Sequence, residues 1–412
     1  MGFILNGNNS WQPGTPIESN SYNWTDAPVV LESSRAIRVG ARTAIDLFCG
    51  CGGFSEGFRM AGFEAALAAD IHPPSLATYQ RNHPEATAIL GDLRKVDEQQ
   101  AIDLLNGHQV DLIAAGVPCQ GFSLNNRKRW DEDDRNLLFR EFIRFVHIAQ
   151  PHVVVLENVS GLRSAGNGRF KEAIAEAIED AGYNVQFRVL NAADFGVPQK
   201  RQRVFFVGVR PGITFAWPTA THGPGASTPW VGVWDAIGDL PPLDPGKVAH
   251  FYDKPAFSDY QRLMRGDATV LLNHRAPNHP EEVIRKIGST LPGAPMYPKF
   301  KQRIRLHPDE PSPTQVSGGI RPQFQFGHPT QARGLSIRER CRIQSFPDLY
   351  EITGGTVQGR VQTGNAVPPL LARAIAGSVM EALETWNGQH EPSEPRIRAV
   401  QTSFETLEQM AF

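Results

Sequence analysis

A cysteine stands between a proline and a glutamine in the run GVPCQGFS over 116–123, directly after an apolar stretch that predicts a buried strand over 111–115. In an open α/β sheet, the residues that follow the carboxyl ends of the strands line the ligand site. A thiolate in such a place is a nucleophile, so Cys119 is the first candidate for covalent chemistry. Taken alone, a free cysteine is more often a small buried hydrophobe. The other candidate groups decide between these two interpretations.

Polar groups accompany two further predicted strands. Glu157 and Asn158 end the strand predicted over 153–158, and burial of Glu157 would favour its protonated form, which can donate a proton. Arg201 and Arg203 precede the strand predicted over 204–209. Because they are two residues apart, their side chains point the same way if the chain is extended there. The alternative is that Glu157 is a solvated carboxylate at a strand end and that the two arginines lie at a solvated sheet edge. Together with Cys119, these groups predict a nucleophile, an acid and two cations at one site.

A glycine-rich turn, DLFCGCGGFSEGF over 46–58, joins the first predicted strand to a helix. Its glycines allow a sharp turn and a close approach to a ligand, and such a turn is a nucleotide site in α/β folds. Asp70 ends the next strand, where a carboxylate suits two ribose hydroxyls, and Asp92 is placed to hydrogen-bond an adenine amino group. The spacing is not GxGxxG, which disfavours a nicotinamide enzyme. An adenosyl ligand without phosphates, such as S-adenosylmethionine, fits better.

The elements that must position these groups alternate along the chain. Strands are predicted over 43–48, 64–70, 111–115, 153–158, 185–190 and 204–209, and helices over 136–149, 170–181, 336–345 and 370–385. Continuous apolar strands with helices between them predict an α/β fold with a doubly wound, mainly parallel, Rossmann-like sheet.

Changes in composition divide the chain further. The predicted parts are a polar N-terminal arm over 1–41, an alternating strand–helix part over 42–210, a small loop-rich domain over 211–334, a part with helical pattern over 335–386, and a polar tail over 387–412. Prolines and glycines crowd the loop-rich part, and its periodicity fades.

The overall composition is that of a globular protein, with 412 residues, 41% hydrophobic and 20% charged. We expect no signal peptide, no apolar run long enough to span a bilayer, and, with four cysteines, no disulfide framework or zinc site. These features predict a cytoplasmic protein. The stretch 261–345 carries 14 Lys and Arg against 6 Asp and Glu, a local charge of +8 in a chain of net charge −2. Such a basic region is an electrostatic footprint for phosphates.

Several short blocks, in the same order and at the same spacings, resemble bacterial DNA (cytosine-5)-methyltransferases of the restriction-modification type. The matching blocks are DLFCGCGGFSEGF, GVPCQGFS, the ENV triplet at 157–159, the QxRxR pattern at 199–203, RERCRIQSFP at 338–347 and GNAVPP at 364–369. They cover roughly 43–210 and 335–386. The resemblance therefore implies one catalytic domain over 42–210 and 335–386, with the family's variable target-recognition domain over 211–334 between its two parts.

The resemblance implies that Cys119 attacks carbon 6 of a flipped-out cytosine, so that carbon 5 can take a methyl group. Glu157 would protonate ring nitrogen 3, with Asn158, Arg201 and Arg203 beside it. S-adenosylmethionine, which leaves as S-adenosylhomocysteine, would contact Phe48, Gly50, Cys51, Gly53, Asp70, Ile71, Asp92, Pro118, Leu138, Asn365 and Ala366. Asp70 and Ile71 depart from the family, which more often has Glu and an aromatic residue there.

The resemblance also implies double-stranded DNA as the substrate, bound by a mobile loop that closes over it. The candidate DNA contacts are Gln120, Asn125, Arg127, Lys128 and Arg129 in that loop, and Arg303, Arg305 and Arg321 in the variable domain. We expect no metal, no membrane, a monomer located with the nucleoid, and a cognate restriction or phage-defence system.

Two alternatives remain at this point. A tRNA cytosine-5 methyltransferase shares almost all these blocks, but usually carries a Cys-Phe-Thr tripeptide that this chain lacks. A catalytically silent DNA-binding member would have lost Cys119 or Glu157, and both are present.

Overall fold

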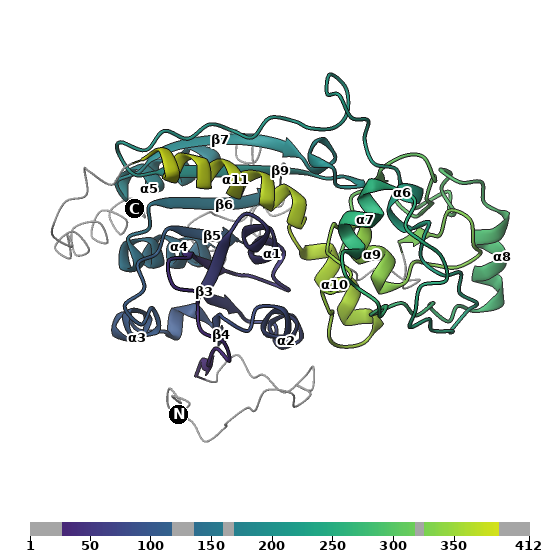
Figure 1. Ribbon diagram of the computed structural model, residues 1–412, viewed down its shortest axis with the longest axis horizontal. Coiled ribbons are helices and arrows are strands. Elements are labelled where there is room, and N and C mark those ends of the chain that lie inside the picture. Colours follow the sequence, from purple (N-terminus) through teal and green to yellow (C-terminus); the bar gives the residue numbers. More distant parts are fainter. Residues whose placement is uncertain (1–26, 118–135, 160–168, 318–324, 387–412) are drawn as a thin grey trace.

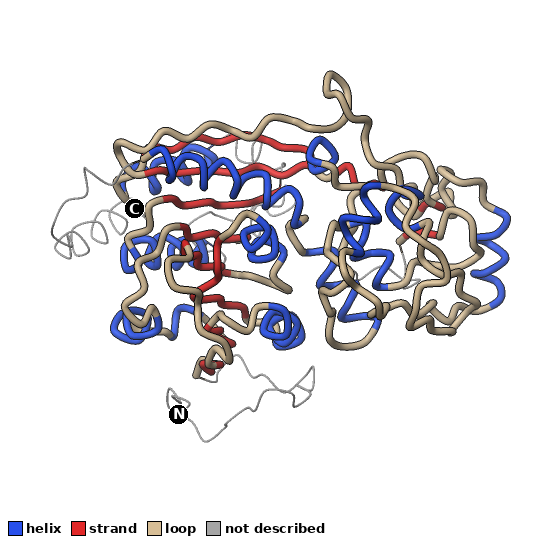
Figure 2. Tube along the Cα trace, in the orientation of Figure 1, coloured by secondary structure: helices blue, strands red, loops and turns tan. Residues whose placement is uncertain are grey.

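The computed structural model describes residues 27–117, 136–159, 169–317 and 325–386. Figure 1 shows two lobes: a larger one built on a sheet, and a smaller one that carries α6 to α10. In Figure 2 the strands of the larger lobe lie among helices, whereas loops dominate the smaller lobe. The predicted α/β class is confirmed by this arrangement.

The sheet of the larger lobe has eight strands in the order β1-β4-β3-β2-β5-β6-β9-β7. Their bounds are β1 Val29–Leu31, β2 Arg42–Leu47, β3 Phe63–Asp70, β4 Thr87–Leu90, β5 Leu112–Gly116, β6 Val153–Val159, β7 Asn184–Asn191 and β9 Gln202–Val209. The strands from β4 to β6 are parallel, β9 runs antiparallel between β6 and β7, and β1 pairs antiparallel with β4. The sheet is therefore mainly parallel, as predicted.

Helices cover both faces of this sheet. One face carries α1 (Gly53–Met60), α2 (Pro73–Asn82) and α11 (Pro369–Thr385), and the other carries α3 (Glu98–Leu104), α4 (Asn136–Ala149) and α5 (Arg169–Asp180). Consecutive strand residues point to opposite faces, so Phe205 packs in the cluster with α1 and α11 while Phe206 packs in the cluster with α4 and α5. Strands that are apolar on both faces must be buried on both, which accounts for the two helix layers.

The smaller lobe contains short helices joined by long loops. Its elements are α6 Val233–Ile237, α7 Asp259–Arg265, α8 Glu281–Ser289, α9 Ile337–Ile343 and α10 Thr356–Asn365, with the parallel pair β10 (Ile304–Arg305) and β12 (Phe326–Gly327). A second pair, β11 (Ser312–Pro313) with β8 (Gln199–Lys200), joins this lobe to the residues before β9. In space α9 and α10 lie with the smaller lobe (Figure 1), whereas the family resemblance implied that they belong to the catalytic domain.

Buried ion pairs hold the smaller lobe together. Arg342 is fully buried between Asp348, 2.5 Å away, and Asp239, 3.2 Å away. Arg333 forms a 2.6 Å pair with Glu339. Breaking such a pair costs several kcal/mol, because it leaves an uncompensated buried charge.

The basic stretch 261–345 is therefore not the exposed patch that its charge suggested. Five of its arginines are buried: Arg303, Arg333, Arg338, Arg340 and Arg342. A count of charges along the chain cannot distinguish a guanidinium in the core from one on the surface, so the predicted phosphate footprint is smaller than expected.

Two further expectations differ from the structure. The predicted arm is not wholly separate, because Val29–Leu31 forms the edge strand β1 of the sheet. The stretch Thr356–Thr385 is long and apolar enough to cross a membrane by length and composition, but 67% of its most apolar window is buried. It consists of α10 and α11, and the packing of α11 against α1 accounts for its apolar composition.

Candidate active site

The carboxyl ends of β2, β3, β5 and β6 meet at one edge of the sheet, and residues of the smaller lobe contact the groups at this edge. Tyr350 and Gln315, which lie in the smaller lobe, bond to Cys51 and Arg201 there. In an open α/β sheet this edge is where ligands bind. The candidate site therefore lies between the two lobes.

Glu157 lies beside the exit of β5. It pairs in register with Gly116, and a Cβ built on Gly116 would lie 3.7 Å from Glu157 Oε2. The Glu157 residue is 9% exposed. Because the chain leaves Gly116 toward Cys119 three residues later, the Glu157 carboxyl group lies beside the start of the segment that carries the candidate nucleophile.

Arg203, in the neighbouring strand β9, pairs with this carboxyl group, and Arg201 lies just before the same strand. Arg203 Nε lies 2.7 Å from Glu157 Oε1. Arg201 is buried, and donates to the main-chain oxygens of Gln315 at 3.1 Å and Asn365 at 3.5 Å. Burial and the nearby charge of Arg203 lower the pKa of Arg201 to about 9. Within the described part of the chain, Arg201 Nε has no hydrogen-bond partner, so one buried donor at this site remains open to a ligand.

Asn158 holds the backbone at the exit of β5. Its side chain is buried, its Nδ2 donates to the Val117 oxygen at 3.3 Å, and its Oδ1 accepts from Val159 N at 2.8 Å. Val117 is the last described residue before Pro118. These contacts make Asn158 a residue that positions the start of the Cys119 segment.

The glycine-rich turn follows β2 directly. Phe48 has a φ of 56° and Gly50 a φ of 55°, and a Cβ on Gly50 would meet no atom within 4 Å. A Cβ on Gly53 would lie 2.1 Å from the oxygen of Val367. The turn is thus open at Gly50, whereas at Gly53 it packs closely against the residues that follow α10. An open, left-handed glycine is the kind of cradle that a ligand fills.

Asp70 shapes this turn from the end of β3. Its Oδ2 accepts from Gly50 N and its Oδ1 from His72 N, both at 2.7 Å. Burial raises the pKa of Asp70, although these two hydrogen bonds act to lower it. Each carboxylate oxygen has a second lone pair, so Asp70 can still accept from a ligand hydroxyl.

Asp92 follows β4, and its carboxylate group is already hydrogen-bonded to Arg94. Arg94 Nη2 donates to Asp92 Oδ2 at 2.7 Å, and the Arg94 backbone N–H donates to Oδ1 at 3.1 Å. Burial alone would raise the pKa of Asp92, but the bonds from Arg94 outweigh it and lower the pKa. A ligand amino group would have to share this carboxylate with Arg94.

The remaining predicted cofactor residues lie around the same turn. Ile71 is half-buried next to Asp70, and Leu138 packs against the core from α4. Cys51 packs with Ala366 in one buried cluster, which leaves mainly the backbone of Cys51 to face a ligand. Asn365 is exposed at the end of α10.

Eight predicted residues fall outside the described part of the chain. They are Pro118, Cys119, Gln120, Asn125, Arg127, Lys128, Arg129 and Arg321.

Arg303 and Arg305, two of the candidate DNA contacts, both make contacts within the smaller lobe. Arg303 is 2% exposed, with its guanidinium 4.6 Å from the ring centre of Phe300 and 5.7 Å from that of Tyr297. Arg305 Nη1 donates to the oxygens of Ile287, Gly288 and Thr290, at 3.3, 3.2 and 2.9 Å. Arg303 therefore packs against aromatic rings, and Arg305 caps the carboxyl end of α8.

We expect Arg305→Ala to destabilise the smaller lobe by about 1–3 kcal/mol, because several helix-terminal carbonyl groups lose their donor. Denaturant unfolding measures this loss. Arg285→Ala is the matched control. Arg285 lies on α8, the helix that Arg305 caps, and its ion pair with Glu281 is exposed and 3.9 Å long. Unchanged stability together with a weaker salt dependence of DNA binding would instead make Arg305 a phosphate contact.

Asp46 is a buried carboxylate that the sequence analysis did not single out. Its Oδ2 accepts from Ser55 Oγ at 2.7 Å, whereas its Oδ1 has no partner within the described residues. Burial raises the pKa of Asp46 to about 7. An acidic residue between the apolar residues Ile45 and Leu47 near the end of β2 is the sequence signal that could have identified it.

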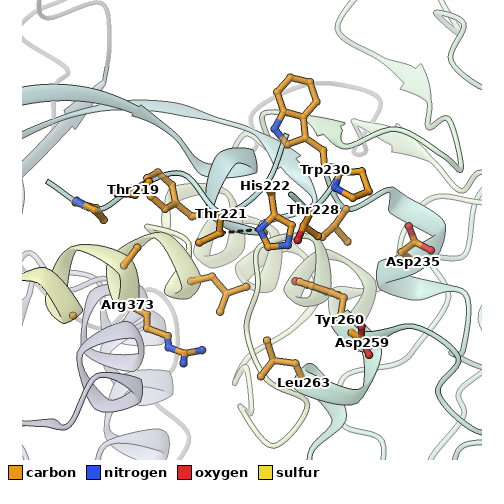
Figure 3. Close-up of a pocket in the computed structure, with 18 of the residues that line it drawn as sticks. Thr219, Thr221, His222, Thr228, Trp230, Asp235, Asp259, Tyr260, Leu263 and Arg373 are labelled. Atoms are coloured by element: carbon orange, nitrogen blue, oxygen red, sulfur yellow. Dashed lines mark hydrogen bonds between the residues drawn. The ribbon is translucent and has the colours of Figure 1, made fainter. Parts of the chain in front are cut away.

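A separate cavity of about 750 Å³ lies between α11, α7 and the loop around Trp230. Figure 3 shows His222, Tyr260 and Leu263 on its walls, with His222 Nδ1 2.8 Å from Thr221 Oγ1. It contains none of the residues that the sequence predicted for the site. Among the described residues no cluster of three or more potential metal ligands occurs.

Comparisons with known proteins agree with this geometry. Residues 42–381 match the family described as C-5 cytosine-specific DNA methylase. The Type II methyltransferase M1.HphI of Haemophilus parahaemolyticus is 35% identical over 396 residues, which cover 92% of this chain and 99% of that protein. The Type II methyltransferase M.AgeI of Thalassovita gelatinovora is 34% identical, covering 82% of this chain and 99% of that protein.

Solved structures show the same fold. A putative DNA modification methyltransferase encoded within a prophage of E. coli has a TM-score of 0.71 at 24% identity, over 84% of this chain and 100% of its own. The Dnmt2 methyltransferase of S. pombe has a TM-score of 0.55 at 16% identity, over 84% of this chain and 99% of its own.

Proposed function

Because the chain belongs to the family of C-5 cytosine-specific DNA methylases, we propose that it methylates carbon 5 of one cytosine within a short, specific DNA sequence. The observation that carries this proposal is the convergence at one sheet edge of the Glu157–Arg203 pair, the exit of β5 toward Cys119, and the glycine-rich turn. We further propose double-stranded DNA as the substrate, a monomeric cytoplasmic enzyme, and a restriction-modification partner that recognises the same sequence.

The chemistry needs a nucleophile and an acid on the same base. Addition of the Cys119 thiolate to carbon 6 forms a carbon–sulfur bond and moves electron density to carbon 5. Glu157, if protonated, delivers its proton to ring nitrogen 3, which removes the negative charge that the addition would leave there. Arg203 holds the Glu157 carboxyl group in place, and the open Nε of Arg201 is available to the base carbonyl or the target phosphate. After carbon 5 has taken the methyl group, its proton passes to water and the proton on ring nitrogen 3 returns to Glu157, so that the carbon–sulfur bond breaks and Cys119 leaves as a thiolate.

The methyl donor that we propose is S-adenosylmethionine, which supplies a methyl group on a positively charged sulfur when bound. The residues present fit an adenosyl group: Gly50 is open where a Cβ would stand, and Asp70 retains acceptor capacity next to it. The backbone of Cys51 and the end of α10 at Asn365 complete the proposed contacts. Phe48, Gly53, Ile71, Asp92, Pro118, Leu138 and Ala366 remain proposed cofactor residues.

The target cytosine must leave the helix, because a stacked base cannot present the required faces to a thiol. Flipping costs a few kcal/mol. We propose that the segment from Cys119 to about 134 closes over the DNA, with Gln120 filling the vacated space. Asn125, Arg127, Lys128 and Arg129 would contact the backbone, and Arg321 stays a candidate for base recognition.

We expect Asp70→Ala to weaken S-adenosylmethionine binding by roughly 10- to 100-fold, because the turn loses a charged acceptor for two backbone N–H groups and the proposed ribose contact. Calorimetric titration measures the affinity, and sequencing of modified DNA should show an unchanged target. Asp97→Ala is the control, since Asp97 also accepts a backbone N–H, from Gln100, but caps α3. Equal affinities in the Asp70 variant and the unaltered protein would contradict the cofactor role.

The function is tested by expressing the protein in a host that lacks cytosine methylation, then mapping 5-methylcytosine in genomic DNA and in tRNA by conversion sequencing. We expect complete methylation at one short DNA motif, which also identifies the target. Methylation confined to tRNA would replace the proposal with the tRNA alternative. Folded protein without methylation of either would favour a silent DNA-binding member.

A further inference from the structure

Tyr350 connects the smaller lobe to the glycine-rich turn. It lies beyond α9, is 3% exposed, and packs with Cys51, Cys341 and Phe346 in one buried cluster. Its hydroxyl group donates to the main-chain oxygen of Cys51. The Tyr350 side chain, which belongs to the smaller lobe, thus binds a peptide group of the proposed cofactor turn in the larger lobe.

The same hydroxyl group also contacts His83. The distance from Tyr350 Oη to His83 Nε2 is 3.2 Å, and the His83 side chain is fully buried. Because the single hydroxyl proton goes to Cys51, His83 Nε2 must carry the proton of this second contact. The orientation of the Tyr350 hydroxyl group is thereby fixed toward Cys51.

Glu85 and Arg35 lie next in this buried row. His83 Nδ1 faces Glu85 Oε1 at 3.7 Å, and Arg35 of the N-terminal region lies 2.8 Å from Glu85 Oε2. Burial alone would raise the pKa of Glu85, but the neighbouring His83 ring and the bond from Arg35 outweigh it and lower the pKa to about 2. Glu85 is therefore charged at neutral pH, and the buried row is anchored at its outer end.

Gly52 shows how closely Tyr350 approaches the turn. A Cβ on Gly52 would lie 2.5 Å from Tyr350 Oη and 3.0 Å from His83 Nε2. Residues next to Tyr350 bind α2 as well: Thr353 N donates to Thr78 Oγ1, and Glu351 N to Asn82 Oδ1, both at 2.9 Å. The segment that carries Tyr350 is thus fixed to the larger lobe on two sides of the turn.

We propose that Tyr350 is a positioning residue for the methyl donor: its hydroxyl group, backed by His83, fixes the Cys51–Gly52 peptide in the orientation that binds the cofactor. Tyr350 lies on the smaller lobe, so the affinity for the donor depends on how that lobe is seated. This inference rests on the proposed function, because it takes the glycine-rich turn as the site of S-adenosylmethionine.

The test compares Tyr350→Phe with Tyr183→Phe. Tyr183 is an equally buried tyrosine whose hydroxyl group donates to the Pro151 oxygen at 2.8 Å, but at the opposite edge of the sheet. Calorimetry with S-adenosylmethionine and with S-adenosylhomocysteine, without DNA, gives the affinities. We expect Tyr350→Phe to weaken both by roughly three- to tenfold, the value of one lost hydrogen bond, and Tyr183→Phe to leave both unchanged.

Two further readouts separate positioning from general stability. In steady-state kinetics, KM for the cofactor should rise in Tyr350→Phe while KM for DNA and kcat at saturation stay constant. In hydrogen–deuterium exchange without ligands, the peptide covering 48–58 should exchange faster in Tyr350→Phe and not in Tyr183→Phe. A structural role alone would lower the unfolding temperature of either variant without changing cofactor affinity.

The possible failures are distinguishable. If the unaltered protein does not bind S-adenosylmethionine, the proposed cofactor is wrong and the inference falls with it. If the unaltered protein binds and Tyr350→Phe matches it in affinity and in exchange, the inference alone is wrong. Equal losses in both variants would also overturn it, because the effect would then be one of stability.

Discussion

Replacing Cys119 by Ala is expected to lower methyl transfer by roughly 10⁴-fold or more, since removal of a covalent nucleophile leaves only binding and orientation. The other cysteines cannot take over its role. Cys49, Cys51 and Cys341 are all buried, and burial raises the pKa of each thiol, to about 11 for Cys341. Single-turnover transfer of a labelled methyl group to DNA measures the loss.

Cys341→Ala is the matched control for this experiment. It removes a thiol from a buried position on α9, so some stability is lost, but the rate of transfer per folded molecule should stay the same. DNA containing 5-fluorocytosine at the target adds a second readout, because fluorine at carbon 5 cannot leave as a proton does and the cysteine adduct persists. An adduct that forms with Cys119→Ala, or transfer at the normal rate, would contradict the mechanism.

Replacing Glu157 by Gln is expected to lower transfer by roughly 10²- to 10⁴-fold, the usual contribution of a positioned acid, while DNA binding persists. Glutamine keeps the size of the side chain but has no proton to give to ring nitrogen 3. It also loses the charge that pairs with Arg203 at 2.7 Å. Rates at saturating DNA and cofactor, together with DNA affinity from a filter assay, separate chemistry from binding.

Glu64→Gln provides the control, because Glu64 is another buried glutamate that pairs with an arginine, Arg38, at 2.5 Å. It begins β3, at the edge of the sheet away from the site. We expect this variant to lose stability and keep its rate. A normal rate in Glu157→Gln would refute the role of Glu157, and equal rate losses in the two variants would indicate damage to the fold.

The sequence predicted the central sheet well because its strands are buried on both faces. Apolar runs such as 153–158 and 204–209 have no other stable place than the middle of a sheet, and they form β6 and β9. The helix predicted over 136–149 has the same bounds as α4. The three-residue strand β1 was missed, because it is held by pairing with β4 and has no pattern of its own.

The site was predicted in part. Residues at the carboxyl ends of parallel strands, such as Glu157 and Asp70, lie at one edge because the topology requires it. The ring contact of Arg303 and the helix-capping contacts of Arg305 could not be predicted, because an arginine that packs within the fold and one that binds DNA are the same letter in a sequence. Tyr350 escaped notice because its role depends on Cys51, 299 residues away along the chain.

The return of α11 onto α1 has a consequence for the integrity of the chain. A Cβ on Gly57 of α1 would lie 2.4 Å from the Cβ of Ala372 in α11, so the two helices touch almost backbone to backbone. The whole smaller lobe lies between β9 and α11 along the sequence. A break of the polypeptide inside that lobe would leave two pieces that still share the α1–α11 contact and its buried core. The same architecture is therefore compatible with assembly from two separately translated polypeptides.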